Sequence, residues 1–354
     1  KNFSSLLRKY DVPGPRYTSY PTVPYWEITP TEIQWIDQLQ AALGEIQSEP
    51  ALYIHIPFCE SLCTYCGCNT RITRNHALSA PYIESVLAEW ALYRKRLGIL
   101  HSFPLSELHL GGGTPTFLTP DELRTLIEGI LCHTRISPNA EFSIEADPRV
   151  TTPAHLECLA QLGFRRISLG IQDFDPHVQK VVHREQTETQ VQAITERARE
   201  LGFTSVNYDL IYGLPFQTCA SIEGTLATVE RLHPDRIAFY SYAHVPWIKP
   251  SQRRFTESDL PLSERKRELY ELGRQSLEAQ GYREIGMDHF ALETDSLWSA
   301  FVSSSLHRNF MGYISRQVSP LIGLGVSAIG DCWTAFAQNE KQVDWNKSQQ
   351  HNPH

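Results

Sequence analysis

Hydrophobic and polar positions repeat along most of this chain in one order: an amphipathic helix, a glycine followed by an aromatic residue, and then an apolar strand. The order is plain at Gly163, Gly202 and Gly281, and glycine suits the left-handed residue that ends a helix. These glycines lie 39 and 79 positions apart (202 − 163 and 281 − 202), which fits one and then two units of a strand–helix repeat. In the repeat unit that lies between Gly202 and Gly281, Pro234 is expected to end the helix in place of a glycine.

Helical periodicity is clear between these stops. Ile83, Val86 and Trp90 share one face of residues 82–97, and residues 191–201 show the same pattern. Six core strands are expected at residues 51–57, 107–110, 141–146, 166–171, 205–210 and 236–241, with further β elements near 284–288 and 321–329. Strands that alternate with helices indicate a parallel sheet with covered faces. Six units are too few for a closed eight-stranded barrel, so the predicted fold is an α/β partial (β/α)6 barrel.

The unusual polar residues all follow expected strands. A cysteine cluster at 59–68 follows the first strand, and the run at 111–116 (GGGTPT) follows the second. The later strands end at Glu145, Gln172, Asp209 and the pair Ala243-His244. Because α/β folds place their active sites at the carboxyl ends of parallel strands, we expect the site at this edge.

The sequence divides into three parts: an N-terminal arm, a catalytic domain that contains the strand–helix repeat, and a C-terminal tail. Residues 1–35 are rich in Pro and Tyr and are expected to form an extended N-terminal arm, and residues 336–354 a polar tail. The catalytic domain is expected over residues 36–335.

Composition narrows the class of protein. The 354 residues carry 32 Lys and Arg against 40 Asp and Glu, a formal net charge of −8 without a basic stretch. Non-specific nucleic-acid binding is therefore disfavoured, because it depends on neutralising phosphates. No apolar run approaches the ~18 residues of a membrane span. With no apolar leader and with clustered thiols, we expect a cytoplasmic protein.

The cysteine cluster points to metal chemistry. Cys59, Cys63 and Cys66 have the spacing C-x3-C-x2-C, and Cys68 follows two positions later. Thiolates select zinc or iron–sulfur, and structural zinc normally uses two separated pairs. Three thiolates on one short loop can hold three corners of a [4Fe–4S] cube and leave one iron open. Iron–sulfur is the favoured reading; zinc and packed or redox thiols remain alternatives.

This loop resembles the radical S-adenosylmethionine (SAM) superfamily, in which C-x3-C-x2-C follows the first strand of a partial barrel. The resemblance narrows to the oxygen-independent coproporphyrinogen III oxidase family, and it covers residues 10–335. It is carried by motifs at 16–21 (RYTSYP), 53–59 (YIHIPFC), 66–69 (CGCN), 111–116 (GGGTPT), 144–149 (IEADPR), 170–174 (GIQDF), 184–186 (REQ), 209–215 (DLIYGLP) and 307–310 (HRNF).

The resemblance implies site residues and cofactors. Cys59, Cys63 and Cys66 would bind a [4Fe–4S] cluster whose open iron is chelated by SAM. A first SAM would be contacted by Tyr53, Tyr65, Gly112 and Glu145. A second SAM would be lined by Gly113, Thr114, Gln172, Arg184, Asp209, Ala243 and Ile329. Outside this resemblance, a single Asp or Arg at a strand end is often a helix cap or a loop ion pair, and the glycines could be a plain turn.

The implied reaction converts two propionates of coproporphyrinogen III to vinyls, giving protoporphyrinogen IX, with Tyr53, Glu145 and Cys68 as catalytic residues. Cys68 would act without ligating the cluster; a buried thiol is the alternative. His55, His109 and His244 are interpreted as hydrogen-bonded core histidines. The substrate carries four carboxylates, and Arg16, Arg149 and Arg308 are candidate counter-charges. An electron donor such as flavodoxin or ferredoxin is implied, and we expect a monomer.

Two departures from the family are visible. The family usually ends with a further helical domain, which this chain is expected to lack, and Met311 stands where Gln is expected. A thioether cannot replace the donor and acceptor of an amide. Two rival functions are a haem-binding chaperone and a related SAM enzyme acting on haem. The retained Cys68 disfavours both, and the arm at 16–21 disfavours the second.

Overall fold

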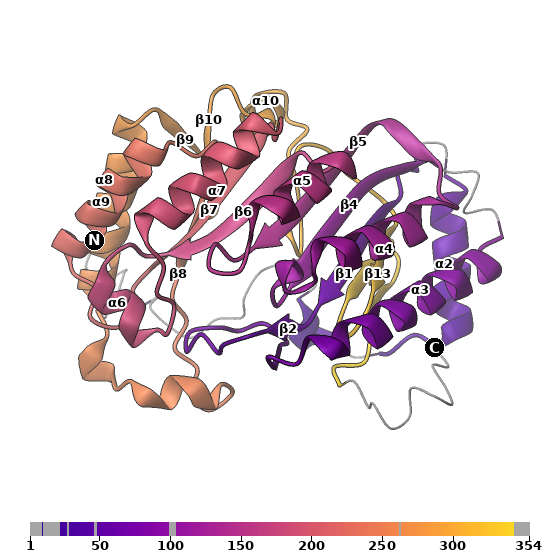
Figure 1. Ribbon diagram of the computed structural model, residues 1–354, viewed down its shortest axis with the longest axis horizontal. Helices are drawn as coiled ribbons and strands as arrows, with labels where there is room; N and C mark the ends of the chain where they lie inside the picture. Colours follow the sequence, from indigo (N-terminus) through magenta and orange to yellow (C-terminus); the bar gives the residue numbers. More distant parts are fainter. Residues whose placement is uncertain are drawn as a thin grey trace.

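A mostly parallel sheet with helices over one face forms the centre of the molecule (Figure 1). The computed structural model describes residue 9 and residues 22–26, 28–45, 48–98, 104–261 and 263–342. Eleven of the described strands form one sheet in the order β15-β14-β13-β1-β4-β5-β6-β7-β8-β10-β9. Its parallel strands are β1 (Ala51–Ile56), β4 (Leu105–Gly112), β5 (Ile136–Ala146), β6 (Arg166–Gln172), β7 (Ser205–Tyr212), β8 (Arg236–Ser241) and β13 (Leu321–Leu324).

Antiparallel strands extend the sheet at both ends. They are β9 (Tyr282–Gly286), β10 (His289–Leu292), β14 (Ile329–Asp331) and β15 (Phe336–Gln338). Two short pairs lie apart from it: β2 (Phe58–Cys59) with β3 (Arg71–Ile72), and β11 (His307–Asn309) with β12 (Gly312–Ile314).

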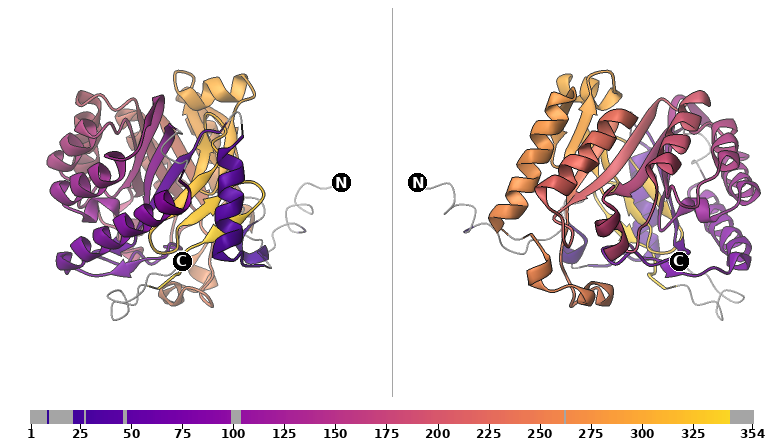
Figure 2. Two further views of the ribbon diagram at one scale, coloured as in Figure 1. Left: turned by 90° about the vertical axis from the view of Figure 1, so that its right-hand side faces the viewer. Right: turned by 60° about the vertical axis from the view of Figure 1, so that its left-hand side comes forward.

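The α-helices in the described part are α2 (Glu32–Leu43), α3 (Ser79–Arg96), α4 (Pro120–Leu131), α5 (Pro153–Gln161), α6 (Pro176–Val181), α7 (Glu188–Glu200), α8 (Cys219–Leu232), α9 (Ser263–Ala279) and α10 (Ser296–Val302). In Figure 1, α3, α4, α5 and α7 lie in a row over one face of the sheet. Turned views separate this helical layer from the C-terminal strands on the other side (Figure 2). The α/β partial barrel is therefore confirmed.

All six predicted core strands are present, but the sequence did not reveal the place of β13. This strand pairs in parallel with β1 and becomes a seventh parallel strand. The expected arm boundary at residue 35 lies inside α2, and the expected tail begins on β15. The motif at 16–21 and residues 343–354 lie outside the described residues.

Helix ends follow the local chemistry that the sequence contains. Gly163, Gly202 and Gly281 all take positive φ (93°, 85° and 95°), as their place before a strand predicts. The helix α8 ends at Leu232, two residues before Pro234, as expected, and the left-handed residue at its end is His233 (φ 48°). A histidine was not expected there because positive φ is costly for a residue with a Cβ.

The two faces of the parallel strands differ in polarity. On β4, Leu108 and Leu110 are fully buried and belong to the core cluster shared with the helices. His109 points to the opposite face, and its Nδ1 lies 2.7 Å from Ser143 Oγ on β5. This opposite face, called the inner face below, is covered over β1 by the β11–β12 hairpin, where the Phe310 and Tyr53 rings meet edge to face at 4.8 Å.

Candidate active site

The cysteine loop lies beyond the carboxyl end of β1, and each of its three spaced thiols has its own polar partner. Cys59 Sγ is 3.4 Å from Thr114 Oγ1, in the loop after β4. The backbone N–H of Cys68 donates to Cys66 Sγ (3.4 Å), and its side chain also contributes to lowering the pKa of Cys66 to about 6. Burial raises the pKa of Cys59 to about 11, so this thiol must release its proton when it binds a metal.

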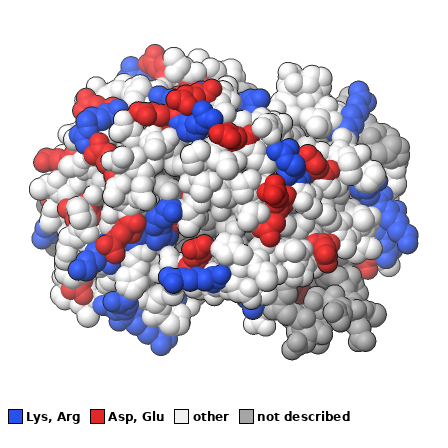
Figure 3. Space-filling model, viewed as in Figure 1, with Lys and Arg blue, Asp and Glu red and all other residues white. Residues whose placement is uncertain are grey.

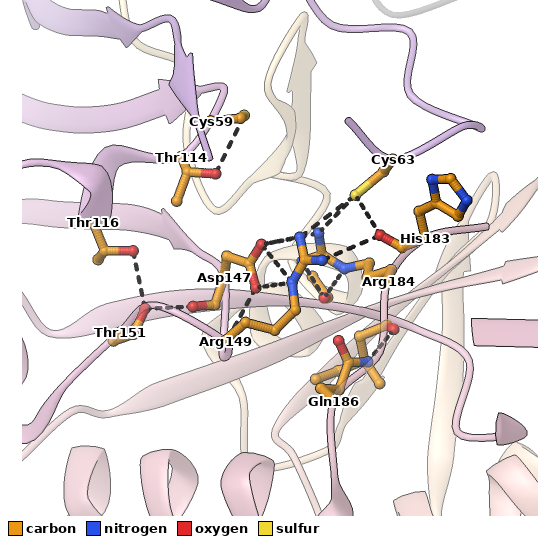
Figure 4. Close-up of polar contacts among 12 residues, drawn as sticks. Cys59, Cys63, Thr114, Thr116, Asp147, Arg149, Thr151, His183, Arg184 and Gln186 are labelled. Atoms are coloured by element: carbon orange, nitrogen blue, oxygen red, sulfur yellow. Dashed lines mark hydrogen bonds and ion pairs between the residues drawn. The ribbon is translucent and has the colours of Figure 1, made fainter. Parts of the chain in front are cut away.

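Cys63 is the most strongly positioned of the three thiols (Figure 4). Its Sγ accepts from Arg149 Nη2 and Arg184 Nη1, each at 3.5 Å. These two guanidinium groups fix the position of the Cys63 sulfur, and sulfur is a ligand that iron accepts. No three His, Cys, Asp or Glu side chains in the described part of the chain converge as around a single metal ion. A [4Fe–4S] cube does not require such convergence, because each thiolate binds a different iron. The donors present fit that group.

Asp147 holds the two arginines in place. Its carboxylate accepts from Arg149 Nη2 (2.7 Å) and from Arg184 Nη1 (3.1 Å). Burial alone would raise the pKa of Asp147, but Arg184 and Arg149 outweigh burial and lower it to about 2. Arg184 also donates to the Gly170 carbonyl, so in this structure its guanidinium is already engaged. Asp147 belongs to the motif at 144–149, but its role could not be assigned from the sequence; its position two residues after Glu145 was the available signal.

The glycine run at the end of β4 is required by the close approach of neighbouring atoms. Gly112 has φ 116°, and a Cβ there would lie 2.8 Å from the ring of His55. A Cβ on Gly113 would lie 2.8 Å from the backbone of Pro57, so the two loops pass each other without room for side chains. The close approach at these two glycines is therefore made to other parts of the protein itself.

Glu145, Tyr53 and Gly112 come together at the end of the inner face. Glu145 Oε2 accepts from Gly112 N (3.1 Å), and its Oε1 lies 3.5 Å from His109 Nε2. Burial would raise the pKa of Glu145, but these two partners lower it, so the carboxylate is charged. The Tyr53 ring stacks on His109 at 5.9 Å, and its OH lies 3.0 Å from His55 Nδ1. Both histidines are hydrogen-bonded residues of the interior, as interpreted from the sequence.

Asp209 occupies the same face on β7. Its carboxylate accepts from Ser168 Oγ (3.0 Å) and Asn207 Nδ2 (2.8 Å). Burial and the nearby charge of Glu145 raise the pKa of Asp209 to about 6. A carboxyl held between its two forms in this way is a group that a cationic or hydroxyl-bearing ligand would stabilise.

The remaining predicted residues line the same edge. Gln172 ends β6 with φ 68°, and Tyr65 packs beside Val178 and Tyr242. Ile329 begins β14, and its backbone approaches Gly323 on β13. Ala243 is exposed, and its carbonyl accepts from Gln252.

Gln252 is a positioning residue that the sequence analysis missed. It is 1% exposed, and its Nε2 donates to the carbonyls of Tyr65 (3.3 Å) and Ala243 (3.2 Å). It therefore joins the cysteine loop to the segment after β8. Lys249 reinforces this link by donating to the Cys68 carbonyl (3.3 Å). No periodicity marks a buried glutamine in an irregular segment, so its sequence carried no signal.

The surroundings of Cys68 and Met311 bear on two points that the sequence left open. Cys68 is exposed, which excludes the alternative of a buried thiol. Met311 packs against the apolar cluster that contains Tyr53 and Ile314. The position where an amide was expected therefore makes an apolar contact.

Comparison with known proteins identifies the class. The radical SAM superfamily model matches residues 53–229. The chain is 42% identical over 345 residues to the oxygen-independent coproporphyrinogen III oxidase of Pseudomonas aeruginosa, covering 96% of this chain and 74% of that relative. It is 41% identical over 348 residues to the Escherichia coli enzyme of that name, covering 96% and 73%. A solved structure of coproporphyrinogen III oxidase from Escherichia coli, described as a radical SAM enzyme, matches with a TM-score of 0.88 and 38% identity, covering 98% and 78%.

The fold and the cysteine loop thus define a radical SAM protein. The chain belongs to the oxygen-independent coproporphyrinogen III oxidase family. It is an oxidoreductase of haem biosynthesis that uses a [4Fe–4S] cluster and SAM to convert two propionates of coproporphyrinogen III to vinyls. No helix in the described ranges is long and apolar enough to cross a membrane.

Proposed function

We propose that the carboxyl edge of the sheet carries out this oxidative decarboxylation with residues from four segments, which lie at or after the ends of β1, β4, β5 and β6. The contacts that carry the proposal join those segments in pairs: Cys59 with Thr114, Cys63 with Arg184, and Gly112 with Glu145. Because each segment lies at or after the end of a different strand, the sheet itself fixes their spacing.

Cys59, Cys63 and Cys66 hold the cluster, and the glycines after β4 with Tyr53, Tyr65 and Glu145 hold the first SAM. When bound, the reduced cluster and SAM supply a 5′-deoxyadenosyl radical. Glu145 is charged and faces Gly112, so it accepts from an ammonium or a hydroxyl of the ligand. The rings of Tyr53 and Phe310 cover the inner face and exclude water from the reacting carbons. Each propionate loses a β-hydrogen atom, CO2 and one electron, which passes to an acceptor.

A second SAM is held on the other side of the same edge, by Gly113, Thr114, Gln172, Arg184, Asp209, Ala243 and Ile329. Arg184 is already held by Asp147, so it presents a fixed positive charge rather than a mobile one. Asp209 accepts from ligand hydroxyls or the amine and becomes fully ionised on binding, since its pKa of about 6 falls when a cation approaches.

Cys68 acts beside the cluster as a proton or hydrogen-atom carrier. It is exposed, and its loop is held from the opposite side by Lys249. The proposal includes a monomer, an electron donor of the flavodoxin or ferredoxin class, and a cytoplasmic location, whose reducing poise keeps clustered thiols available for iron. Residues 36–335 are taken as the catalytic domain.

The number of SAM molecules tests this assignment. Equilibrium dialysis of the reconstituted protein against labelled SAM is expected to give two equivalents per chain. Asp209→Asn is expected to bind one, while the cluster's absorption spectrum stays unchanged. Glu145→Gln is the matched change at the first site. It is expected to lower both SAM binding and the formation of 5′-deoxyadenosine. One equivalent in the unaltered protein would overturn the second site.

A further inference from the structure

The arginines near the inner face fall into two groups. Arg149 and Arg184 are each paired with Asp147. Arg308, on β11, makes neither a hydrogen bond nor an ion pair with any described residue, and its Nε and Nη1 atoms are buried without a partner. Arg16, the third candidate counter-charge from the sequence, lies outside the described residues.

An arginine in this state is unusual. Guanidinium donors that are removed from water normally recover the cost by binding a carboxylate, a carbonyl or a water molecule. The Arg308 guanidinium instead lies over the ring of its cross-strand neighbour Tyr313, 4.7 Å from the ring centroid. Such stacking fixes the plane of the guanidinium and leaves its N–H edges for another acceptor.

Two titratable groups in the described part of the chain face Arg308. Asp288 and His289 are the ones that interact with it electrostatically. Asp288 forms no ion pair with it, and burial raises the pKa of that carboxyl. Burial, assisted by Arg308, lowers the pKa of His289 to about 4, so this histidine is neutral. Asp288 therefore acts on Arg308 through space, while the buried Nε and Nη1 groups of Arg308 have no acceptor among the described residues.

Arg308 also lies near the proposed reaction centre. Two residues along the chain, Phe310 packs against Tyr53. On the other side, Tyr313 packs against His289, whose Nε2 lies 3.3 Å from Tyr240 Oη near the carboxyl end of β8. The hairpin thus spans the inner face between β1 and β8. Figure 3 shows the helix-covered side of the molecule, where acidic and basic side chains are interspersed.

We propose that Arg308, held over Tyr313, is a binding subsite for one carboxylate of the tetrapyrrole substrate. The inference rests on the proposed function, because it takes coproporphyrinogen III as the molecule that enters the inner face. The planar fork suits a carboxylate, which would accept two parallel N–H bonds. Arg308 would thereby orient the macrocycle so that a given propionate faces the radical source, while Arg149 remains committed to Asp147.

Steady-state kinetics with two variants test the subsite. Arg308→Gln removes the charge at similar length and is expected to raise KM for coproporphyrinogen III by about 10- to 100-fold, the range of a lost charge-assisted hydrogen bond. Arg308→Lys keeps the positive charge but loses the planar fork, so its KM is expected to lie between that of the unaltered protein and that of Arg308→Gln. The control is Arg283→Gln, which removes an exposed charge from β9 that is paired with Glu293, and it is expected to keep the original KM.

Substrate analogues make the test specific. The analogues each have one propionate of the substrate replaced by ethyl. For the unaltered protein, one of these analogues is expected to bind more weakly than the substrate. That loss of affinity is expected to equal the loss that Arg308→Gln causes for the substrate itself. Arg308→Gln is expected to bind that analogue and the substrate alike. An unchanged KM, equal losses for all analogues, or loss of substrate-independent 5′-deoxyadenosine formation would overturn the subsite. Failure of the unaltered protein to decarboxylate the substrate would instead refute the proposed function.

Discussion

The two ends of the parallel strands differ in how their buried charges are compensated. At the amino end, Arg236 pairs with Asp295 at 2.7 Å, and the two side chains are 8% and 1% exposed. Arg166 pairs there with Glu141 in the same way. At the carboxyl edge, the pKa of Asp209 is raised to about 6, and on the inner face Arg308 has no hydrogen-bond or ion-pair partner among the described residues. The two pairs at the amino end are matched within the chain, as are Arg149 and Arg184 with Asp147 at the carboxyl edge, whereas Asp209 and Arg308 are groups that a ligand would match. Along the same strands, the paired charges therefore serve stability, and the groups without a matching charge are available for ligand binding.

The largest effect is expected where the carboxyl edge is broken directly. Cys63→Ala removes one of the three cluster ligands and the sulfur between two guanidinium groups. Iron content is expected to fall and 5′-deoxyadenosine formation to stop, while the far-ultraviolet circular dichroism spectrum is retained. Cys132→Ala, an exposed thiol after α4, serves as the control and is expected to keep both. Full activity of Cys63→Ala would remove this cysteine from the site.

At the amino end, the effect is expected on stability. Arg236→Met leaves Asp295 buried without its partner and is expected to lower the free energy of unfolding by about 3–5 kcal/mol. Replacing both residues by apolar ones is expected to recover most of this, less about 1 kcal/mol because Asp295 also caps α10. Urea unfolding of the three proteins measures both values. A loss below about 1 kcal/mol for Arg236→Met would show that the pair is not needed.

A smaller effect, of opposite sign, is expected at the carboxyl edge. The folded pKa of Asp209 is raised to about 6, so its favourable contribution is present below pH ~4 and is lost as the pH rises through 6. Asp209→Asn is therefore expected to stabilise the SAM-free protein by about 1–2 kcal/mol at pH 7.5 and not at pH 3.5. Thermal unfolding at the two pH values measures the difference.

Asp147→Asn is the matched contrast at the same edge. The pKa of Asp147 is lowered to about 2, so its contribution is present above pH ~4 and is lost as the pH falls through 2. This variant is expected to be destabilised by about 2 kcal/mol at pH 7.5. If both variants shifted stability in the same direction, the two carboxyls would not differ as described.

The smallest effect is expected at the surface. Arg197 pairs with Glu157 and Glu200, but these side chains are 35–63% exposed. Arg197→Gln is expected to leave the free energy of unfolding and the turnover nearly unchanged. A change comparable to that of Arg236→Met would contradict the role given to burial.

The sequence was sufficient for elements whose signals are local. The helix stops at Gly163, Gly202 and Gly281 and the six core strands follow from periodicity and backbone preference. The pairing of β13 with β1 was not predictable, because residues 321–324 pair with a strand some 270 positions earlier and no local feature records that. For the same reason, the link from Gln252 to the cysteine loop could not be read from spacing.

The candidate site shows the same division. The thiol spacing and the positions at strand ends predicted which residues share the carboxyl edge, and the structure places them there. The sequence did not show that Asp147 would form ion pairs with both Arg149 and Arg184, or that Arg308 would have no partner among the described residues. Which of several like charges finds a partner depends on tertiary contacts between loops.

Anaerobic turnover tests the central claim most directly. The reconstituted protein with reductant, SAM and coproporphyrinogen III is followed by mass spectrometry for 5′-deoxyadenosine and for each loss of CO2 and hydrogen. The account predicts both products together, with two decarboxylations per tetrapyrrole. Formation of 5′-deoxyadenosine without decarboxylation, in protein that carries a full cluster, would contradict it.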